Sequence, residues 1–237
     1  MASVASAADL SAAVPTCPGW TVTRLVRHTG IVHRWATQIV ATRAAARIEQ
    51  RSLDVGLPDS AAGYPSWLAA GAAPLAATLR AAGPDTQVWA WGPVQSSGWW
   101  ARRMLHETTV HRVDAELALG LTPVLEAAAA ADGIDEFLLT GPSGSRPSTR
   151  LAELPGGQSI HLHATDEGLG EAGEWLISLT GGGYAWSHGH AKGTVAVRGP
   201  VDVLLLLVYG RVRPDDDRLQ VFGDDSLLAA WQEIMTL

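Results

Sequence analysis

The sequence predicts an α+β protein in which a helical domain, expected over residues 1–139, precedes a smaller α+β domain, expected over residues 148–237. Residues 1–131 are rich in alanine, and their apolar positions recur at the 3.6-residue spacing of helices. Residues 148–222 instead carry short alternating apolar stretches separated by glycines, which is the pattern of strands. Turn-forming residues fill positions 140–148, and we expect this segment to link the two domains.

The individual elements follow from the local pattern. Thr21 is a suitable N-cap for the first long helix, and a second long helix is expected over Gly98–Gly120. The later elements are expected to be a short helix over Asp132–Leu139, strands over 159–164, 174–179 and 193–197, a helix over 200–209, a strand over 219–222, and a last helix capped by Asp224 or Asp225, with Leu227, Leu228, Trp231, Ile234 and Met235 on its buried face.

Composition excludes several classes of protein. A chain of 237 residues that is 47% hydrophobic and 17% charged can bury a substantial core. Its net charge of −7 argues against a nucleic-acid-binding or anionic-membrane-binding protein. The longest apolar run, Val203–Tyr209, is far shorter than the ~20 residues of a membrane span. Cys17 is the only cysteine, which excludes an internal disulfide and a cysteine-rich zinc site. We therefore expect a soluble, cytoplasmic protein.

The first long helix carries a histidine on its apolar face. Leu25, His28, Val32, Trp35 and Ile39 follow the 3-4-3-4 spacing of a helix face in a bundle. His33 lies five residues after His28, or about 140° around the helix, and is expected to point elsewhere. Taken alone, His28 is better explained as a core or interface histidine that is hydrogen-bonded to a neighbour.

The second long helix combines polar and apolar residues on one face. That face is expected to contain Trp100, Met104, Glu107, His111, Asp114 and Ala118. A salt-bridged, solvated face is an alternative, but flanking Val110, Val113 and Leu117 favour the interior. Buried polar groups of this kind must be paired or bound to metal.

Glu107 and His111 are spaced to bind one ion. They lie four residues apart, or about 40° around the helix, so both side chains can reach the same ion. Asp114, one turn further on, is placed to orient an imidazole. The HExxH motif is absent, because the histidine after His106 comes five residues later. With His28 from the facing helix, Glu107 and His111 would form a three-ligand site with an open position, as in catalytic zinc sites.

Two segments resemble the mycothiol-dependent maleylpyruvate isomerase family. They are Val14–Val22, with the sequence VPTCPGWTV, followed by LVRHTG and VHRWA, and Arg103–Glu116, with the sequence RMLHETTVHRVDAE. The segments Gly189–Pro200 and Leu204–Arg211 are similar to the C-terminal domain of that family.

The resemblance implies a DinB-like four-helix bundle that holds a divalent metal, usually zinc, followed by an α+β domain of sterol-carrier type. The family's metal ligands fall on His28, Glu107 and His111, and an active-site arginine of its C-terminal domain falls on Arg211. Only 16 residues precede the Cys-Pro-Gly-Trp motif. Either the first helix is very short, or the start is misassigned, or another segment fills its place in the bundle.

The resemblance also implies a reaction. The thiol of mycothiol, activated at the metal, would attack an electrophilic carbon of a small substrate. In an isomerase the adduct would rotate and expel the thiol, whereas in an S-transferase the thiol would stay attached. Arg211 would bind a substrate carboxylate or stabilise enolate charge. Two alternatives are a metal-dependent hydrolase and a non-catalytic module that binds a small molecule.

The remaining candidates have simpler explanations. Cys17 precedes a helix start, where its thiol pKa would fall, but a small packing residue is the favoured interpretation. His161, His163, His188 and His190 would gather at a metal if their strands were neighbours, although a polar exposed sheet face is favoured. Gly181–Gly183 and Asp215–Asp217 are expected to be turns, and the tryptophans at positions 89, 91, 99 and 100 are expected in the core.

Overall fold

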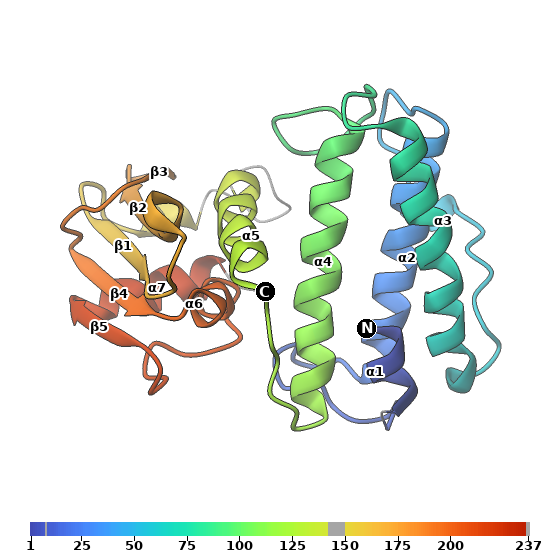
Figure 1. The fold of residues 1–237 in the computed structure, drawn as a ribbon, viewed down its shortest axis with the longest axis horizontal. Helices are drawn as coiled ribbons and strands as arrows, with labels where there is room; N and C mark the ends of the chain where they lie inside the picture. Colours follow the sequence, from blue (N-terminus) through green and yellow to red (C-terminus); the bar gives the residue numbers. More distant parts are fainter. Residues whose placement is uncertain (8, 142–149, 236–237) are drawn as a thin grey trace. The chain divides into compact units, whose positions relative to one another are not determined.

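The computed structural model describes residues 1–7, 9–141 and 150–235, and the chain divides into two compact units (Figure 1). The first unit comprises Met1–Pro123 and the second Val124–Leu237. The α+β prediction is confirmed by these two units, the first helical and the second built on a sheet. Among the described residues, every helix is too short or too polar to cross a lipid bilayer.

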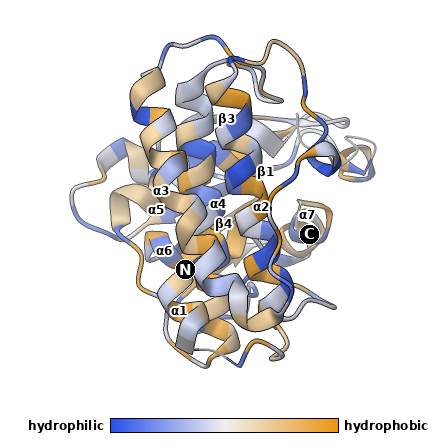
Figure 2. Ribbon diagram, turned by 90° about the vertical axis from the view of Figure 1, so that its right-hand side faces the viewer, coloured by the Kyte–Doolittle hydropathy of each residue, from blue (hydrophilic) through white to orange (hydrophobic). Residues whose placement is uncertain are grey.

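The first unit is made of helices. These are α1 (Ala2–Ala7), α2 (Val22–Ala41), α3 (Tyr64–Ala82) and α4 (Ser97–Ala118), with short 3₁₀ turns η1 (Gln50–Ser52) and η2 (Ala61–Gly63). The first helix is very short, as one of the sequence-based alternatives had it. The predicted N-cap of α2 is confirmed, because the side chain of Thr21 accepts a hydrogen bond from the backbone N–H of Arg24. Figure 2 shows hydrophilic and hydrophobic residues alternating along these helices.

The core of the first unit is dominated by tryptophan. Trp100 on α4 is fully buried, and its ring lies 5.1–5.2 Å from the rings of Trp35, Trp91 and Trp99. Its indole N–H donates to the backbone carbonyl of Trp89 over 2.7 Å. The expectation of core tryptophans is confirmed, and this cluster fixes the N-terminal half of α4 against α2.

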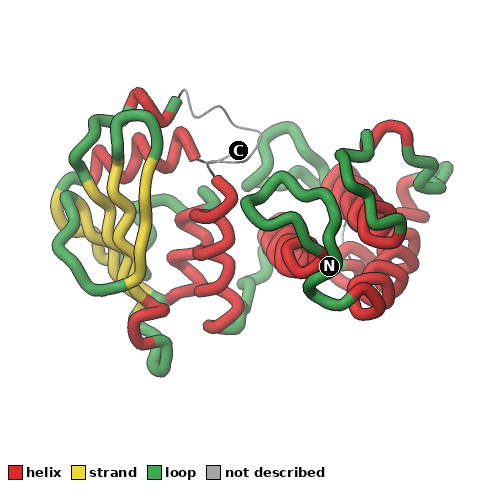
Figure 3. The backbone as a smooth tube through the Cα atoms, turned by 90° about the horizontal axis from the view of Figure 1, so that it is seen from above, coloured by secondary structure: helices red, strands yellow, loops and turns green. Residues whose placement is uncertain are grey.

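The second unit places three helices on one face of a five-stranded sheet (Figure 3). Its elements are α5 (Ala127–Thr140), η4 (Leu151–Glu153), β1 (Ser159–Ala164), η5 (Gly170–Gly173), β2 (Glu174–Leu179), β3 (Tyr184–His188), β4 (Val195–Gly199), α6 (Val201–Val208), β5 (Gln220–Gly223) and α7 (Asp225–Met235). The strand order is β3-β2-β1-β4-β5, with only β1 and β4 parallel among the described strands. β3 is a strand that the sequence did not predict.

The division between the units falls earlier than the sequence predicted. α5 belongs to the second unit, because Ile134 and Leu138 pack into the same core as the apolar face of the sheet. Its alanine-rich start resembles the helices of the first unit in composition, and composition alone cannot show which core a helix joins. The predicted linker at 140–148 lies largely outside the described residues, which omit 142–149.

Candidate metal centre

His28, Glu107 and His111 meet at the contact between α2 and α4. His28 Nε2 lies 2.9 Å from Glu107 Oε1, and His111 Nε2 lies 3.4 Å from the same oxygen. One ligand atom from each of the three residues falls within 4.8 Å of the others. The structure thus brings together the three residues that the spacing and the resemblance selected.

A buried aspartate fixes the ring of His111. Asp114 is fully buried on α4, and its Oδ2 lies 2.8 Å from His111 Nδ1. Its other oxygen accepts a hydrogen bond from the hydroxyl of Thr16 over 2.5 Å. An N–H at Nδ1 of His111 that donates to Asp114 leaves the Nε2 lone pair free for a metal. The expected orienting role of Asp114 therefore has its hydrogen bond in place.

An arginine fixes the carboxylate of Glu107 in the same manner. Arg103, one turn earlier on α4, donates from Nη2 to Glu107 Oε2 over 2.9 Å. This contact occupies one carboxylate oxygen and leaves Oε1 directed at the two histidines. Glu107 would thus bind a metal through a single oxygen.

The ionisation of the acidic and basic groups follows from these contacts. Burial alone would lower the pKa of His111, but hydrogen bonds to Asp114 and Glu107 raise it to about 9, so without a metal its Nε2 carries a proton that a bound ion would have to displace. Burial opposes ionisation of Glu107, yet its contacts with His111 and His28 and the charge of Arg103 hold its pKa well below the usual range. The carboxylate is therefore ionised and negative near neutral pH.

The donor set fits a divalent transition metal. Two imidazoles and one carboxylate oxygen converge, and Asp114 and Arg103 engage the atoms of His111 and Glu107 that face away from the centre. Ligands of this kind suit Zn²⁺ and also Ni²⁺, Co²⁺ and Fe²⁺. Three protein ligands leave room for a further ligand from solution.

Trp20 forms a wall beside the histidines. Its ring lies 5.1 Å from the ring of His28, edge to face, and stacks at 6.2 Å on that of His111. The guanidinium of Arg24 lies over the same indole, 4.9 Å from its centroid. This role of Trp20 was not predicted from the sequence, although Trp20 belongs to the Cys-Pro-Gly-Trp motif directly before the helix of His28, which was a usable signal.

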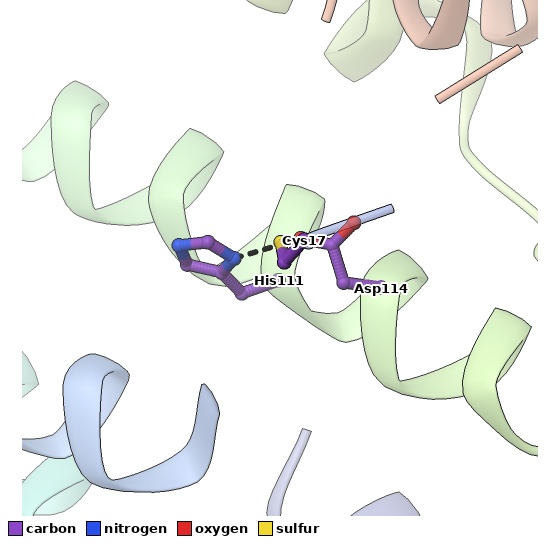
Figure 4. A group of neighbouring side chains, drawn as sticks. All are labelled: Cys17, His111 and Asp114. Carbon is purple, nitrogen blue, oxygen red and sulfur yellow. Dashed lines mark hydrogen bonds and ion pairs between the residues drawn. The ribbon is translucent and has the colours of Figure 1, made fainter. Parts of the chain in front are cut away.

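Cys17 lies beside His111 and Asp114 (Figure 4). Its Sγ is 3.5 Å from Asp114 Oδ2, and the residue is half-buried against the apolar core around α1. His111 Nδ1 and Asp114 already contact each other at 2.8 Å, so this group supports the imidazole of His111 on the side opposite to Glu107. The packing interpretation of Cys17 fits this position, with an added contact to Asp114.

His33 is buried, although the sequence placed it away from the site. It is 4% exposed, and its Nε2 lies 2.8 Å from the hydroxyl of Thr108 on α4. More than one side of α2 is covered, because this helix packs against both α3 and α4. A 140° rotation around α2 therefore leads to another buried position rather than to solvent.

Burial of His33 makes the folded state sensitive to acid. Desolvation lowers the pKa of His33 to about 4, from an ordinary 6.5 in the unfolded chain. Between these values the unfolded chain binds a proton that the folded chain does not, so stability falls as the pH decreases from 6.5 toward 4. This loss amounts to up to about 3 kcal/mol, at ~1.4 kcal/mol per pH unit.

The variant His33→Gln removes this titration and keeps a partner for Thr108. Urea unfolding of the two proteins between pH 7 and pH 4 is expected to give a shallower pH dependence for the variant. Equal slopes in the two proteins would show that His33 does not titrate in this way.

Arg211 follows α6 in the second unit. Its Nη1 donates to the backbone carbonyl of Tyr209 over 2.7 Å, and its side chain is half-buried. Among the other predicted features, Gly181 adopts a left-handed turn with φ of 77°, and Asp216 pairs with Arg218 in the turn after Pro214.

Comparisons with known proteins decide the family. The model of the mycothiol maleylpyruvate isomerase N-terminal domain matches residues 1–116, and the model of the C-terminal domain of the same family matches residues 127–230. The chain belongs to the mycothiol maleylpyruvate isomerase family. The two matches confirm the resemblance, and the segment between them contains the division at Pro123 and Val124.

More distant comparisons add little to the family assignment. No curated protein matches the chain. Among solved structures it is similar to the stereoselective inverting sec-alkylsulfatase Pisa1 from Pseudomonas sp., with 12% identity and a TM-score of 0.35. That match covers 90% of this chain, which spans about 30% of the sulfatase chain.

Proposed function

We propose that this member of the mycothiol maleylpyruvate isomerase family is a metal-dependent, mycothiol-using isomerase or S-transferase that acts on a small electrophilic substrate. One observation carries the proposal: Nε2 of His28 and Nε2 of His111 both face the same carboxylate oxygen, Oε1 of Glu107. Membership of the family supports a DinB-like fold for the first unit, a sterol-carrier-like fold for the second, and mycothiol as the thiol.

In this proposal the residues of α2 and α4 have separate tasks. His28, Glu107 and His111 hold the ion, Asp114 keeps the tautomer of His111 that can bind it, and Arg103 orients Glu107. A bound divalent ion would act as a Lewis acid that lowers the pKa of a thiol, and mycothiol would supply that thiol. Trp20 limits access of water to the imidazoles on its side of the site.

Asp114→Asn tests the orienting hydrogen bond. An amide that presents its N–H₂ group to Nδ1 favours the tautomer with a proton on Nε2, which cannot bind metal. We expect metal affinity to fall about 10- to 100-fold, as for other residues that hold a metal ligand in place. Competition with a chromogenic chelator measures the affinity. An unchanged affinity in a folded Asp114→Asn protein would contradict the assigned role.

Arg211 is proposed to bind a carboxylate of the substrate. A charge-assisted hydrogen bond of this kind contributes about 1.5–3 kcal/mol, so Arg211→Gln is expected to lower kcat/KM by about 10- to 100-fold. The metal content should not change. Arg213→Gln, at an exposed arginine paired with Asp215, is the matched control. Equal activity of Arg211→Gln and Arg213→Gln would exclude the proposed contact.

The proposed function is tested by the dependence of turnover on both metal and thiol. Full-length protein is stripped with a chelator, reloaded with Zn²⁺, and assayed with maleylpyruvate with and without mycothiol. We expect turnover only when both are present. Turnover without the thiol, such as hydrolysis of an ester by the loaded protein, would instead indicate a hydrolase. Binding without turnover of any substrate would indicate a binding module.

A further inference from the structure

A second group of histidines surrounds a carboxylate in the second unit. His161 and His163 lie on β1, on the face of the sheet opposite to Ile160 and Leu162, which enter the core. Glu174 begins β2 and pairs in register with His163. The three side chains therefore share the face of the sheet that the helices do not cover.

A loop brings the third histidine to this face. His190 follows β3 in the segment that leads to β4. Gly193 lies against β1 so closely that a β-carbon there would be 2.9 Å from the backbone nitrogen of His161 and 3.1 Å from its β-carbon. Glycine at this position thus allows the loop to cover His161, which is only 3% exposed. His188 is in a different place, 3.3 Å from Asp135 of α5.

All three imidazoles contact the carboxylate of Glu174. His161 Nε2 lies 2.7 Å from Oε2, and His163 Nδ1 lies 2.8 Å from Oε1. His190 Nδ1 is 3.2 Å from each oxygen. The rings of His161 and His190 are 5.2 Å apart. Four groups that ligate metals thus gather around one point, from β1, β2 and the loop after β3.

The contact of His161 is not an ordinary hydrogen bond. Its Nε2 atom is buried and, although it lies 2.7 Å from Glu174 Oε2, it meets the geometry of a hydrogen bond with none of the described residues. A buried polar atom without a partner is costly. A metal ion among His161, His190 and Glu174 would satisfy it, because the nitrogen would then bind through its lone pair.

We propose that His161, His190 and Glu174 form a second site for a divalent transition-metal ion of the zinc class. One ligand atom from each lies within 4.8 Å of the others. His163 holds Oε1 of Glu174, so that Oε2 faces His161. The pattern matches that of the first site, where Arg103 holds one oxygen of Glu107 and two histidines face the other.

The surroundings of this second site permit a cation to enter. Arg198 is paired in register with His163, but its guanidinium is engaged by the side chain of Gln220 on β5 over 3.2 Å, while Lys192 lies in the same loop as His190. The side chain of His190 is 77% exposed, whereas those of His161 and Glu174 are 4% and 15% exposed. Two ligands are therefore held by the sheet, and the third can close over an ion from the loop.

Metal content of full-length variants tests this site separately from the first. Chelator-stripped proteins are loaded with Zn²⁺, desalted, and analysed for metal per chain. We expect two equivalents in the wild type, one in Glu107→Gln, one in His190→Ala, and none in the protein with both changes. His188→Gln, a histidine change on the adjacent strand, should retain two. His190 is exposed in a loop, so its replacement leaves the core intact.

Titration of Glu107→Gln with Zn²⁺ measures the second site alone. In this background His190→Ala should weaken binding by at least about 100-fold, and His163→Gln by about 10- to 100-fold, since His163 acts through Glu174. One equivalent in the wild type and none in Glu107→Gln would overturn the proposal and leave a hydrogen-bonded cluster. Metal retained equally with and without His190 would overturn it too. Neither result would alter the test of turnover at the first site.

Discussion

Replacement of Glu107 by glutamine is expected to remove the metal from the first unit and to lower thiol-dependent turnover by about 10³-fold. The amide has the shape of the carboxylate but no charge, and the neutral oxygen is a weak ligand for Zn²⁺. A metal acting as a Lewis acid lowers the activation barrier by several kcal/mol. Losing this stabilisation corresponds to the expected decrease in rate. Metal analysis of the purified variant and assays at saturating mycothiol measure the two effects.

Glu116→Gln provides the matched control on the same helix. Glu116 pairs with Arg112 over 2.7 Å, and among the described residues no ion pair joins it to the three proposed ligands. The control is expected to retain metal and activity. If Glu107→Gln kept both, the proposed centre would not be the site of the reaction.

Trp100→Ala is expected to destabilise the first unit by about 3–5 kcal/mol, the usual cost of truncating a buried tryptophan. The indole is fully buried among three other tryptophans, and its N–H donates to Trp89. Because α4 carries both Glu107 and His111, loss of this anchor should also reduce metal retention. Urea unfolding followed by circular dichroism measures the change in stability.

Trp186→Ala is the comparison for the loss of an indole. Trp186 lies on β3 and is only half-buried against the core of the second unit. We expect a cost well below that of Trp100→Ala and unchanged metal retention in the first unit. Equal destabilisation by the two substitutions would show that the tryptophan cluster does not anchor α4 as described.

The convergence of His28, Glu107 and His111 was predictable because its information is local to each helix. The spacing of Glu107 and His111 places both on one face of α4, and the apolar neighbours of His28 place it on a buried face of α2. The meeting of these two faces was expected from the pairing of helices in a bundle and from the resemblance. Asp114 could be predicted in the same way, since it lies one turn beyond His111.

Other features depend on contacts that the local sequence does not encode. His33 is buried because α2 has two helical neighbours, and α5 joins the second unit through Ile134 and Leu138. The cluster at Glu174 requires the strand order, in which β2 separates β1 from β3. The four histidines were therefore visible in the sequence, but the carboxylate that gathers three of them was not.

The central claim is that His28, Glu107 and His111 hold a divalent metal ion. Anomalous scattering at the zinc absorption edge, from crystals of the full-length protein grown with Zn²⁺, tests it most directly. The account predicts a peak at about 2.0–2.2 Å from Nε2 of His28, Oε1 of Glu107 and Nε2 of His111. Zinc-loaded crystals without a peak at these three atoms would contradict it.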